Sequence, residues 1–307
     1  MKLFKNLYYK LRHYFNKLRD YLLLIIRPVI AVSSNSYHTD GLGALLQWQL
    51  WAYSLSRLHN KKYQFINFQN VAHYKFEKLT SQEFDKKINF YFKLDKLSNG
   101  ESKKILKIYD ENKNGNSKSE IIKNRRSIQR NFDSNINIVY KNKYLIHIGD
   151  SLEKSKTIIN NGNLSVGIHL RIFNQDDNVY DDIDTFKLFD RDSKSVDRVN
   201  NIISHIEKEY DEKNIDFYLL IQHDSKKLDD ITVSKYNNSL YKIIGVDVFE
   251  TISTLVEVDL LVGANSSLSY ICHLLSGKKA YFNKEFRYNL YPNCKFYDDE
   301  GIVFSSR

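Results

Sequence analysis

Cysteine, proline and glycine are all scarce in this chain of 307 residues. Two cysteines, Cys272 and Cys294, cannot form a disulfide framework and lack the spacing of metal ligands, which indicates a reducing compartment. Only 2 Pro and 11 Gly exclude collagen-like and proline-rich architectures. In contrast, 42% of the residues are hydrophobic, and 22 Tyr and 18 Phe supply bulky side chains. This composition excludes general disorder and suits one large or two ordinary domains.

A long apolar run is also missing. The segment Tyr21–Ile26 ends at Arg27 and Pro28, whereas a membrane span needs about 20 apolar residues, and no signal-peptide cleavage site follows. The spacing of apolar residues instead predicts a basic amphipathic helix over residues 1–28. Either residues 1–27 anchor the protein on an anionic membrane surface, or the helix packs on the body. We expect a cytoplasmic protein, peripheral on the inner face of the membrane in the first case.

Positive charge is confined to two segments. The formal net charge is +9, from 46 Lys and Arg against 37 Asp and Glu. Residues 1–28 carry seven basic residues and one acidic residue, and residues 101–130 carry nine and four. Because the rest of the chain is slightly acidic, we expect no nucleic-acid partner for the body of the protein.

The segment after residue 28 predicts a βαβ unit. Val29–Ser33 is a β-branched run, Ser34–Gly43 is a loop-like stretch, and Leu45–Leu58 has apolar residues at helical spacing. Tyr63–Phe68 is the next predicted strand, which completes a unit typical of parallel sheets. We predict an N-terminal Rossmann-like domain over residues 29–160, with a polar insertion or mobile excursion at 96–131.

Strands and helices alternate from Ser165 onward. The predicted strands are Val166–Arg171, Phe217–Gln222, Leu240–Ile244, Leu260–Ala264 and Lys279–Phe282. The predicted helices are Val196–Tyr210, Lys226–Tyr236, Val248–Val256 and Leu268–Leu275. This alternation predicts a doubly wound α/β domain over residues 161–307, so that two Rossmann-like domains face a cleft.

Two short segments are placed to contact an anionic ligand. In Asp40-Gly41-Leu42-Gly43, glycines let the backbone approach a ligand at a helix start, although a plain tight turn has the same sequence. In His169-Leu170-Arg171, strand alternation sends His169 and Arg171 to one face at the strand's carboxyl end. Arg171 then either holds a diphosphate through paired hydrogen bonds or pairs with a structural carboxylate such as Asp176 or Asp177.

A third segment begins a predicted helix. Asn265, Ser266 and Ser267 follow a predicted strand directly, so that their hydroxyl and N–H groups meet any phosphate bound there. Simple N-capping by the serines is the other interpretation, and the two roles are compatible.

In this order the three segments resemble those of the fucosyltransferase superfamily, which includes α1,2-, α1,6- and protein O-fucosyltransferases of the two-Rossmann (GT-B) type. The family's glycine loop, G-G-L-G-N-Q-L-F-Q-Y, is similar to Asp40-Gly41-Leu42-Gly43-Ala44-Leu45-Leu46-Gln47-Trp48. Its H-x-R-x-x-D and N-S-S-F-S motifs resemble His169–Asn174 and Asn265–Ser269. The bacterial-type α1,2 branch is nearest in size. The resemblance in motif order and spacing extends over residues 29 to 282.

The resemblance implies transfer of fucose from GDP-fucose to a glycan hydroxyl, with inversion and without a metal cofactor. Its motifs place the donor diphosphate against Arg171, His169 and the turn at Ser266 and Ser267. Gly41, Gly43 and Asn265 belong to the same motifs as donor-side candidates, and Asp224 and Asp259 are candidates for nucleotide contacts or for helix capping. Asp40, Asp176 and Asp177 are the candidate general bases for the acceptor hydroxyl.

This chain departs from the family pattern at several positions. Asn174 stands where the family has an acid, Asp40 replaces the first glycine, and Tyr270-Ile271-Cys272 replaces the tryptophans of the α1,2 branch. The alternatives are another GDP-sugar transferase, or a metal-dependent transferase using Asp182-Ile183-Asp184 or Asp190-Arg191-Asp192. A non-enzymatic module that binds membrane or RNA through the basic segments is a further alternative.

Overall fold

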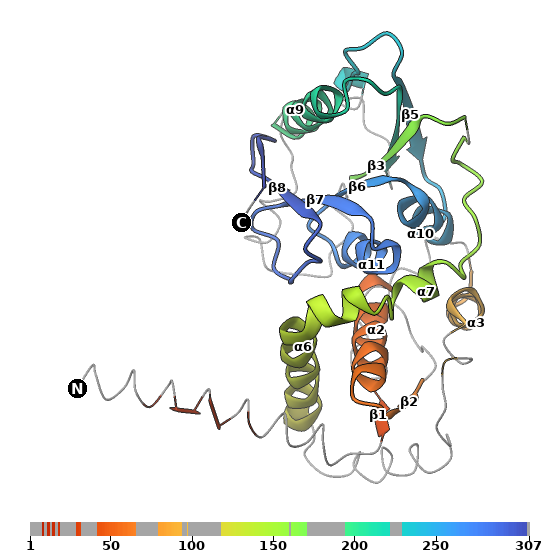
Figure 1. Cartoon of the computed structure of the whole chain (residues 1–307). Helices are drawn as coiled ribbons and strands as arrows, with labels where there is room; N and C mark the ends of the chain where they lie inside the picture. The colour runs from red at the N-terminus through yellow and green to blue at the C-terminus, as the bar shows by residue number, and fades with distance from the viewer. Residues whose placement is uncertain are drawn as a thin grey trace. The chain divides into compact units, whose positions relative to one another are not determined.

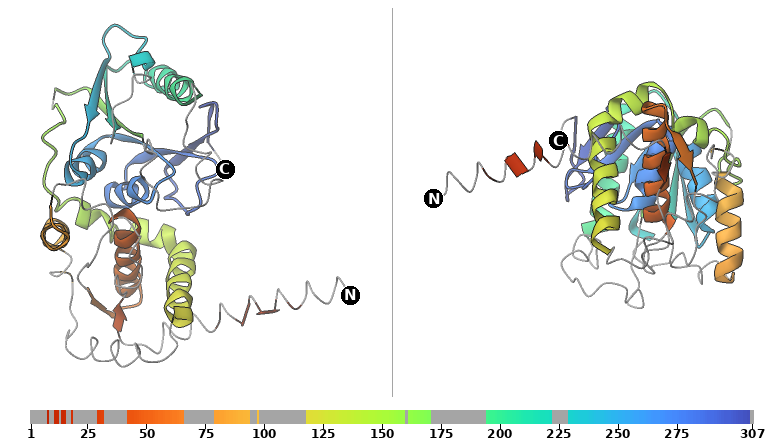
Figure 2. Two further views of the ribbon diagram at one scale, coloured as in Figure 1. Left: turned by 180° about the vertical axis from the view of Figure 1, so that it is seen from behind. Right: turned by 90° about the horizontal axis from the view of Figure 1, so that it is seen from below.

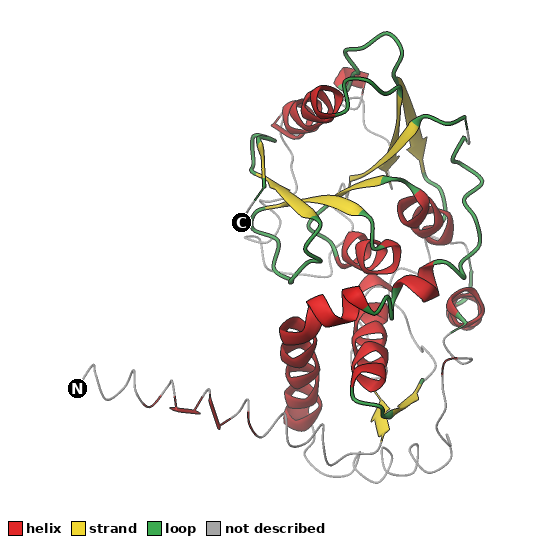
Figure 3. Cartoon of the chain, in the orientation of Figure 1, coloured by secondary structure: helices red, strands yellow, loops and turns green. Residues whose placement is uncertain are grey.

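The structure of the protein is a computed structural model (Figure 1). It describes residues 29–31, 42–65, 79–93, 118–159, 161–170, 194–221 and 229–305, together with residues 8, 11, 12, 14, 15, 18 and 97. The chain forms two compact units. The first comprises Met1–Lys75 and Leu79–Tyr144, and the second comprises Phe76–Lys78 and Leu145–Arg307. Figure 3 shows that both units combine helices and strands.

The first unit contains the predicted βαβ segment. Strand β1 (Val29–Ala31) pairs in parallel with β2 (Lys62–Gln64), and helix α2 (Leu42–Leu58) connects them. The indole of Trp51 on α2 is fully buried and stacks on Phe132 with ring centroids 5.4 Å apart. The apolar spacing of the sequence therefore identified the helix and its buried face correctly.

Two further helices complete the described part of the first unit. Helix α3 (Ser81–Phe92) starts with a capping box in which Thr80 and Glu83 satisfy each other's backbone N–H groups. Helix α6 (Lys118–Lys141) corrects the prediction of a polar excursion over residues 96–131, because residues 118–131 are helical. The stretch is polar overall, but one face of α6 is buried through Ile128, Phe132, Ile136 and Val139.

The second unit is built on a seven-stranded sheet with the order β5-β4-β3-β6-β7-β8-β9. All neighbours are parallel except β8 and β9, which pair antiparallel. The strands are β3 (Leu164–Leu170), β4 (Ile215–Ile221), β5 (Ser239–Ile244), β6 (Leu260–Gly263), β7 (Lys279–Asn283), β8 (Cys294–Tyr297) and β9 (Val303–Phe304). The helices are α7 (Ile146–Gly149), α9 (Lys194–Glu209), α10 (Val248–Glu257) and α11 (Ser267–Ser276).

Helices cover both faces of this sheet, with α9 on one face and α10 and α11 on the other (Figures 1 and 2). Val166 and Ile168 of β3 face the α9 side, where they join a buried cluster with Val199, Ile202, Ile203 and Ile206. Gly167 faces the opposite side, and a Cβ there would lie 3.0 Å from Val258 Cγ2 at the end of α10. His169 follows Gly167 on that side because alternate strand residues share a face.

The second unit begins near residue 145, earlier than the predicted boundary at 160. The carboxylate of Glu250 on α10 accepts hydrogen bonds from Ser155 Oγ (2.8 Å), Lys156 N (2.9 Å) and Thr157 Oγ1 (2.7 Å). These contacts attach residues 155–157 to α10. Hydrophobic periodicity does not reveal them, because these three residues are held by polar groups.

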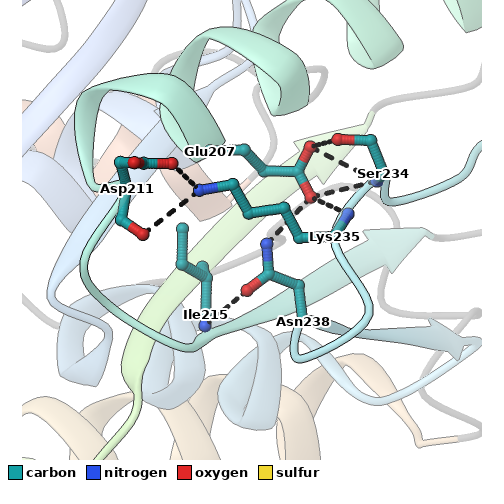
Figure 4. A network of polar contacts seen from close by, with 6 residues as sticks. All are labelled: Glu207, Asp211, Ile215, Ser234, Lys235 and Asn238. Atoms are coloured by element: carbon teal, nitrogen blue, oxygen red, sulfur yellow. Dashed lines mark hydrogen bonds and ion pairs between the residues drawn. The ribbon is translucent and has the colours of Figure 1, made fainter.

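The predicted helix Lys226–Tyr236 is wrong over residues 229–236, which form a short 3₁₀ turn and irregular backbone. The N–H groups of Ser234 and Lys235 donate to the Glu207 carboxylate of α9, at 3.0 and 3.2 Å. Asn238 donates to Glu207 (2.8 Å) and accepts from Ile215 N (2.9 Å), so the loop also holds the start of β4 (Figure 4). The backbone donors that a helix would use are thus bound to α9.

Candidate functional site

The sheet of the second unit has one point where the strand order reverses. From β3 the chain builds outward through β4 and β5, then returns to place β6 on the other side of β3, followed by β7 and β8. If the six parallel strands β3 to β8 are numbered from 1 to 6 in chain order, their order across the sheet is 3-2-1-4-5-6. Doubly wound dinucleotide-binding folds have the same order. Ligands of such sheets bind outside the carboxyl ends of the two central strands. In this sheet the two central strands are β3 and β6.

A histidine and a serine from these two ends are in direct contact. His169 is the penultimate residue of β3, and its Nδ1 lies 2.6 Å from Ser269 Oγ in the first turn of α11. Ser269 Oγ also accepts the N–H of Ala264 at 3.0 Å. Ser269 is fully buried and His169 is 9% exposed, so this contact is shielded from water and joins the two central strands.

The turn between β6 and α11 is organised by Ser266. Ser266 has extended backbone angles and caps α11, because its Oγ accepts the N–H of Ser269 at 3.2 Å. Its own N–H donates to Ala264 O at 2.7 Å. The first N–H groups of a helix have no acceptor within the helix, and the helix dipole adds partial positive charge there. The start of α11 is thus suited to an anion beside His169.

Gly263 is the last residue of β6 and lies close against β7. A Cβ at this position would lie 2.4 Å from Phe282 Cε1 on β7, so a larger residue would push the two strands apart. The carbonyl of Gly263 accepts the hydroxyl of Tyr297 at 2.9 Å. Burial raises the pKa of Tyr297 to about 12, so the hydroxyl remains a neutral donor at physiological pH. These contacts fix the strand end from which the Ser266 turn departs.

Among the predicted site residues, the structure brings four to this edge. His169 lies at the end of β3, and Asn265, Ser266 and Ser267 form the turn after β6. The remaining candidates at Asp40, Gly41, Arg171, Asp176, Asp177 and Asp224 lie outside the described residues. Gly43 is buried in the first turn of α2, in the first unit.

Asp259 is placed at the opposite edge of the sheet. Its carboxylate accepts the N–H and the hydroxyl of Ser165, at 3.0 and 2.8 Å, at the amino end of β3. Ser165 and His169 are four positions apart, which corresponds to about 13 Å along β3. Asp259 therefore holds β3 and β6 in register and does not share an edge with the Ser266 turn.

Sequence reasoning did not assign a role to Ser269. It lies within the Asn265–Ser269 motif, but the residue looks like an ordinary helix residue when only periodicity is considered. Two signals pointed to it: it stands three residues after a capping serine, and a histidine is the penultimate residue of the neighbouring central strand. Neither signal gives the pairing of β3 with β6, which makes the contact.

The described part of the chain contains no group of three or more His, Cys, Asp or Glu side chains arranged to hold a metal ion. Over the same residues, no helix is both long enough and apolar enough to cross a membrane.

No family model, no curated protein and no solved structure matches this chain.

Proposed function

We propose that the protein is a glycosyltransferase that transfers fucose from GDP-fucose to a glycan hydroxyl with inversion, in surface polysaccharide or glycoconjugate synthesis. The proposal includes a GT-B arrangement in which the first unit binds the acceptor and the second binds the nucleotide sugar. The observation that carries it is the contact of His169 with Ser269 at the point where the strand order reverses. Two of the three motif segments that resemble fucosyltransferases thus meet where such sheets bind nucleotides.

The chemistry requires stabilisation of the leaving diphosphate. As the bond to the anomeric carbon breaks, negative charge grows on the diphosphate while the sugar becomes oxocarbenium-like. In the proposal, Arg171, His169 and the first N–H groups of α11 receive that charge. Cations and oriented dipoles of the protein then do what a divalent metal does in other transferases. Asp40, Asp176 and Asp177 are the candidates for the base that deprotonates the acceptor hydroxyl.

GDP is expected to raise the melting temperature of the protein, in buffer containing EDTA, while UDP, CMP and dTDP leave it unchanged. A ligand at 100 times its Kd stabilises by about 2.7 kcal/mol, which corresponds to a shift of roughly 4 °C for a protein of this size. Thermal denaturation monitored by fluorescence measures the shift. Equal stabilisation by UDP would contradict a guanine-specific donor site.

Two variants locate the GDP effect. His169→Ala is expected to lose most of the shift, whereas Asp259→Asn, at the opposite edge of the same sheet, is expected to retain it. The shift is measured for each variant against its own ligand-free melting temperature, so that differences in stability cancel. A shift that requires manganese and disappears with EDTA would favour the metal-dependent transferase instead.

We further propose that the N-terminal segment binds anionic membrane surfaces. The described residues between 8 and 18 are helical. Their apolar side chains are 50% to 76% exposed, at Tyr8, Leu11, Tyr14, Phe15 and Leu18. Four of them, Tyr8, Leu11, Phe15 and Leu18, are spaced by three, four and three residues, which places them on one helix face. A helix packed on the body would bury this face.

The positive charge of residues 1–28 favours an anionic lipid surface as the binding partner. Seven basic residues and one acid within residues 1–28 complement anionic lipid headgroups, and aromatic side chains favour the boundary between headgroups and acyl chains. A protein or glycan partner without negative charge would gain nothing from the excess of basic residues in this segment. An anionic bilayer therefore accounts for both the apolar face and the charge.

The full-length protein is expected to sediment with phosphatidylglycerol-containing vesicles and not with pure phosphatidylcholine vesicles, with binding that weakens as salt rises. Arg12→Glu is expected to weaken binding by more than about fivefold, since the lost basic residue contributes about 1 kcal/mol and the new negative charge is repelled by the anionic surface. Lys86→Glu, an exposed charge on α3, is the matched control. Phe15→Ser and Phe90→Ser, both at exposed aromatic positions, give the corresponding pair for the apolar contribution. Salt-independent self-association without vesicle binding would identify a second copy as the partner and contradict the proposal.

A further inference from the structure

The segment that follows β7, residues 284–293, leaves the sheet at the edge where α11 begins. β6 and β7 are parallel neighbours, and Gly263 at the end of β6 pairs with Phe282. The carboxyl ends of the two strands therefore lie side by side. The N–H of Phe286 donates to Asn283 O at 2.9 Å, so the chain turns immediately after β7. The first residues of this segment thus lie at the edge that carries the proposed donor site.

The 284–293 segment runs along α11 from its first turn to its end. Near the start, the ring of Tyr270 in the first turn of α11 stacks on Tyr288, with centroids 4.9 Å apart. Near the finish, Asn293 Nδ2 donates at 2.8 Å to the carbonyl of Gly277, which caps the other end of the helix. The residues next to Tyr288 are therefore beside the start of α11.

Arg287 brings a positive charge to this position. Its side chain is exposed, and its guanidinium carbon lies 4.7 Å from the centre of the Tyr288 ring. Because Tyr288 is itself stacked on Tyr270, the guanidinium rests on a ring that is held by the helix. None of the ion pairs formed by the described residues includes Arg287. Its charge therefore has no carboxylate partner within the described part of the chain.

A cation beside the start of a helix is favourable only when an anion accompanies it. The helix dipole places partial positive charge at the start of α11, which repels a neighbouring cation. The N–H of Ser269 is bound to Ser266 Oγ, but the N–H groups of Ser267 and Leu268 have no acceptor among the described residues. Two free N–H donors and an unpaired guanidinium on adjoining elements together suit a ligand with several anionic oxygens.

We propose that Arg287 is a further donor-binding residue, whose guanidinium contacts the diphosphate of the nucleotide sugar at the start of α11. Its ligand is the one given by the proposed function, on which this inference rests. Guanidinium presents paired N–H donors that match phosphate oxygens. The diphosphate is already charged before the sugar leaves, and Arg287 is exposed to water, so this contact strengthens ground-state binding more than the chemical step.

The test is the affinity for GDP, measured by isothermal titration calorimetry on the full-length protein. Arg287→Gln is expected to weaken GDP binding about tenfold at low salt, and less at high salt because ions screen an exposed charge. Arg287→Lys is expected to give an intermediate loss, since it keeps the charge but not the paired donors. Lys213→Gln removes an exposed cation from the turn before β4, at the opposite edge of the sheet, and is the matched control. Unchanged GDP affinity in Arg287→Gln would overturn the inference.

A purely structural role for Arg287 predicts a different pattern. If the guanidinium served only to pack on Tyr288, Arg287→Gln would lower the melting temperature of the ligand-free protein and leave GDP affinity unchanged. We expect the reverse, because Tyr288 is stacked on Tyr270 without help from the arginine. In steady-state kinetics the donor KM is expected to rise about tenfold, with a smaller change in kcat. A loss confined to kcat would overturn the binding role.

Inorganic pyrophosphate separates this inference from the proposed donor, because it has the diphosphate chemistry without guanine or sugar. Pyrophosphate binding that weakens in Arg287→Gln, in a protein that does not bind GDP, would support the role of Arg287 and overturn the guanine-specific donor site. GDP binding that is equally strong in the wild-type protein and in Arg287→Gln would support the donor and overturn the role of Arg287.

Discussion

Lowering the pH from 7 to 4.5 is expected to destabilise the wild-type protein by about 2 to 3 kcal/mol more than the His273→Gln variant. The effect comes from one buried imidazole in α11. Burial lowers the pKa of His273 to about 3, whereas an unfolded histidine titrates near 6.5. Between these values the unfolded chain binds a proton that the folded protein excludes, so stability falls as the pH falls.

The surroundings of His273 explain why it stays neutral. The ring is fully buried, with Tyr291 and Phe282 at centroid distances of 5.0 and 5.7 Å. Its Nε2 accepts the N–H of Tyr291 at 3.2 Å and lies 3.2 Å from Cys294 Sγ. Burial also raises the pKa of Cys294, which therefore remains a thiol. A charged imidazolium would lose the Tyr291 hydrogen bond and have no carboxylate beside it among these groups.

The comparison with a variant is needed because other groups also make the stability depend on pH. Burial raises the pKa of Asp133 to about 6, which stabilises the fold as the pH falls and opposes the effect of His273. Glu209 has a pKa of about 2: burial alone would raise it, but hydrogen bonds from Lys279, Lys295 and Tyr281 outweigh burial. Its contribution is lost as the pH falls from about 4.5 towards 2. Asp133 and Glu209 contribute equally to the stability of the wild-type protein and of His273→Gln, so their effects cancel when the two stabilities are subtracted.

Urea unfolding of both proteins at several pH values between 7 and 4.5 measures this difference. Glutamine preserves an acceptor for the Tyr291 N–H but has no group that titrates in this range. Parallel stability curves for the two proteins would contradict a neutral, buried His273. An NMR titration of the wild-type protein provides an independent check, because the His273 ring signal is expected not to move above about pH 4.

Elements governed by apolar periodicity were predictable from the sequence. β3 and β6 are continuous buried runs, α10 has a buried stripe, and α11 is buried on all sides over Ser269–Leu275, so their positions followed from residue type alone. β8 was missed because Lys295 interrupts its short apolar run, and β9 was missed because it has only two residues. The strand order, and with it the position where β3 and β6 meet, is a long-range property that one sequence does not encode locally.

Polar contacts account for the remaining differences. The loop 229–238 is apolar enough at intervals to resemble a helix, but Glu207 on α9 binds its N–H groups instead. The pairing of Ser269 with His169 joins residues 100 positions apart, and nothing in the spacing of either one indicates the other. The position of Asp259 was also not predictable, because the sequence does not show at which end of the sheet a carboxylate next to a strand lies.

Replacing Arg171 with lysine is expected to lower turnover by about 2 kcal/mol or more, roughly 30-fold, while donor affinity falls less. Guanidinium offers two parallel N–H donors to a diphosphate, whereas an ammonium is a single mobile charge. Arg171 follows His169 by two residues in the sequence, and in the proposed mechanism both donate to oxygens whose charge grows as the sugar leaves. A contact that strengthens in the transition state affects kcat more than ground-state binding.

An arginine in a purely structural pair is expected to behave in the opposite way, and Arg198→Lys provides that control. Arg198 on α9 donates to Asp299 O at 2.8 Å and lies 3.8 Å from its carboxylate, so its replacement affects stability and leaves turnover unchanged. Measuring kcat, donor affinity and melting temperature on both variants separates the two roles. Arg171→Lys with a lowered melting temperature and normal turnover would assign Arg171 to a structural pair and remove it from the proposed mechanism. The charge on the leaving diphosphate would then be left to His169 and the start of α11.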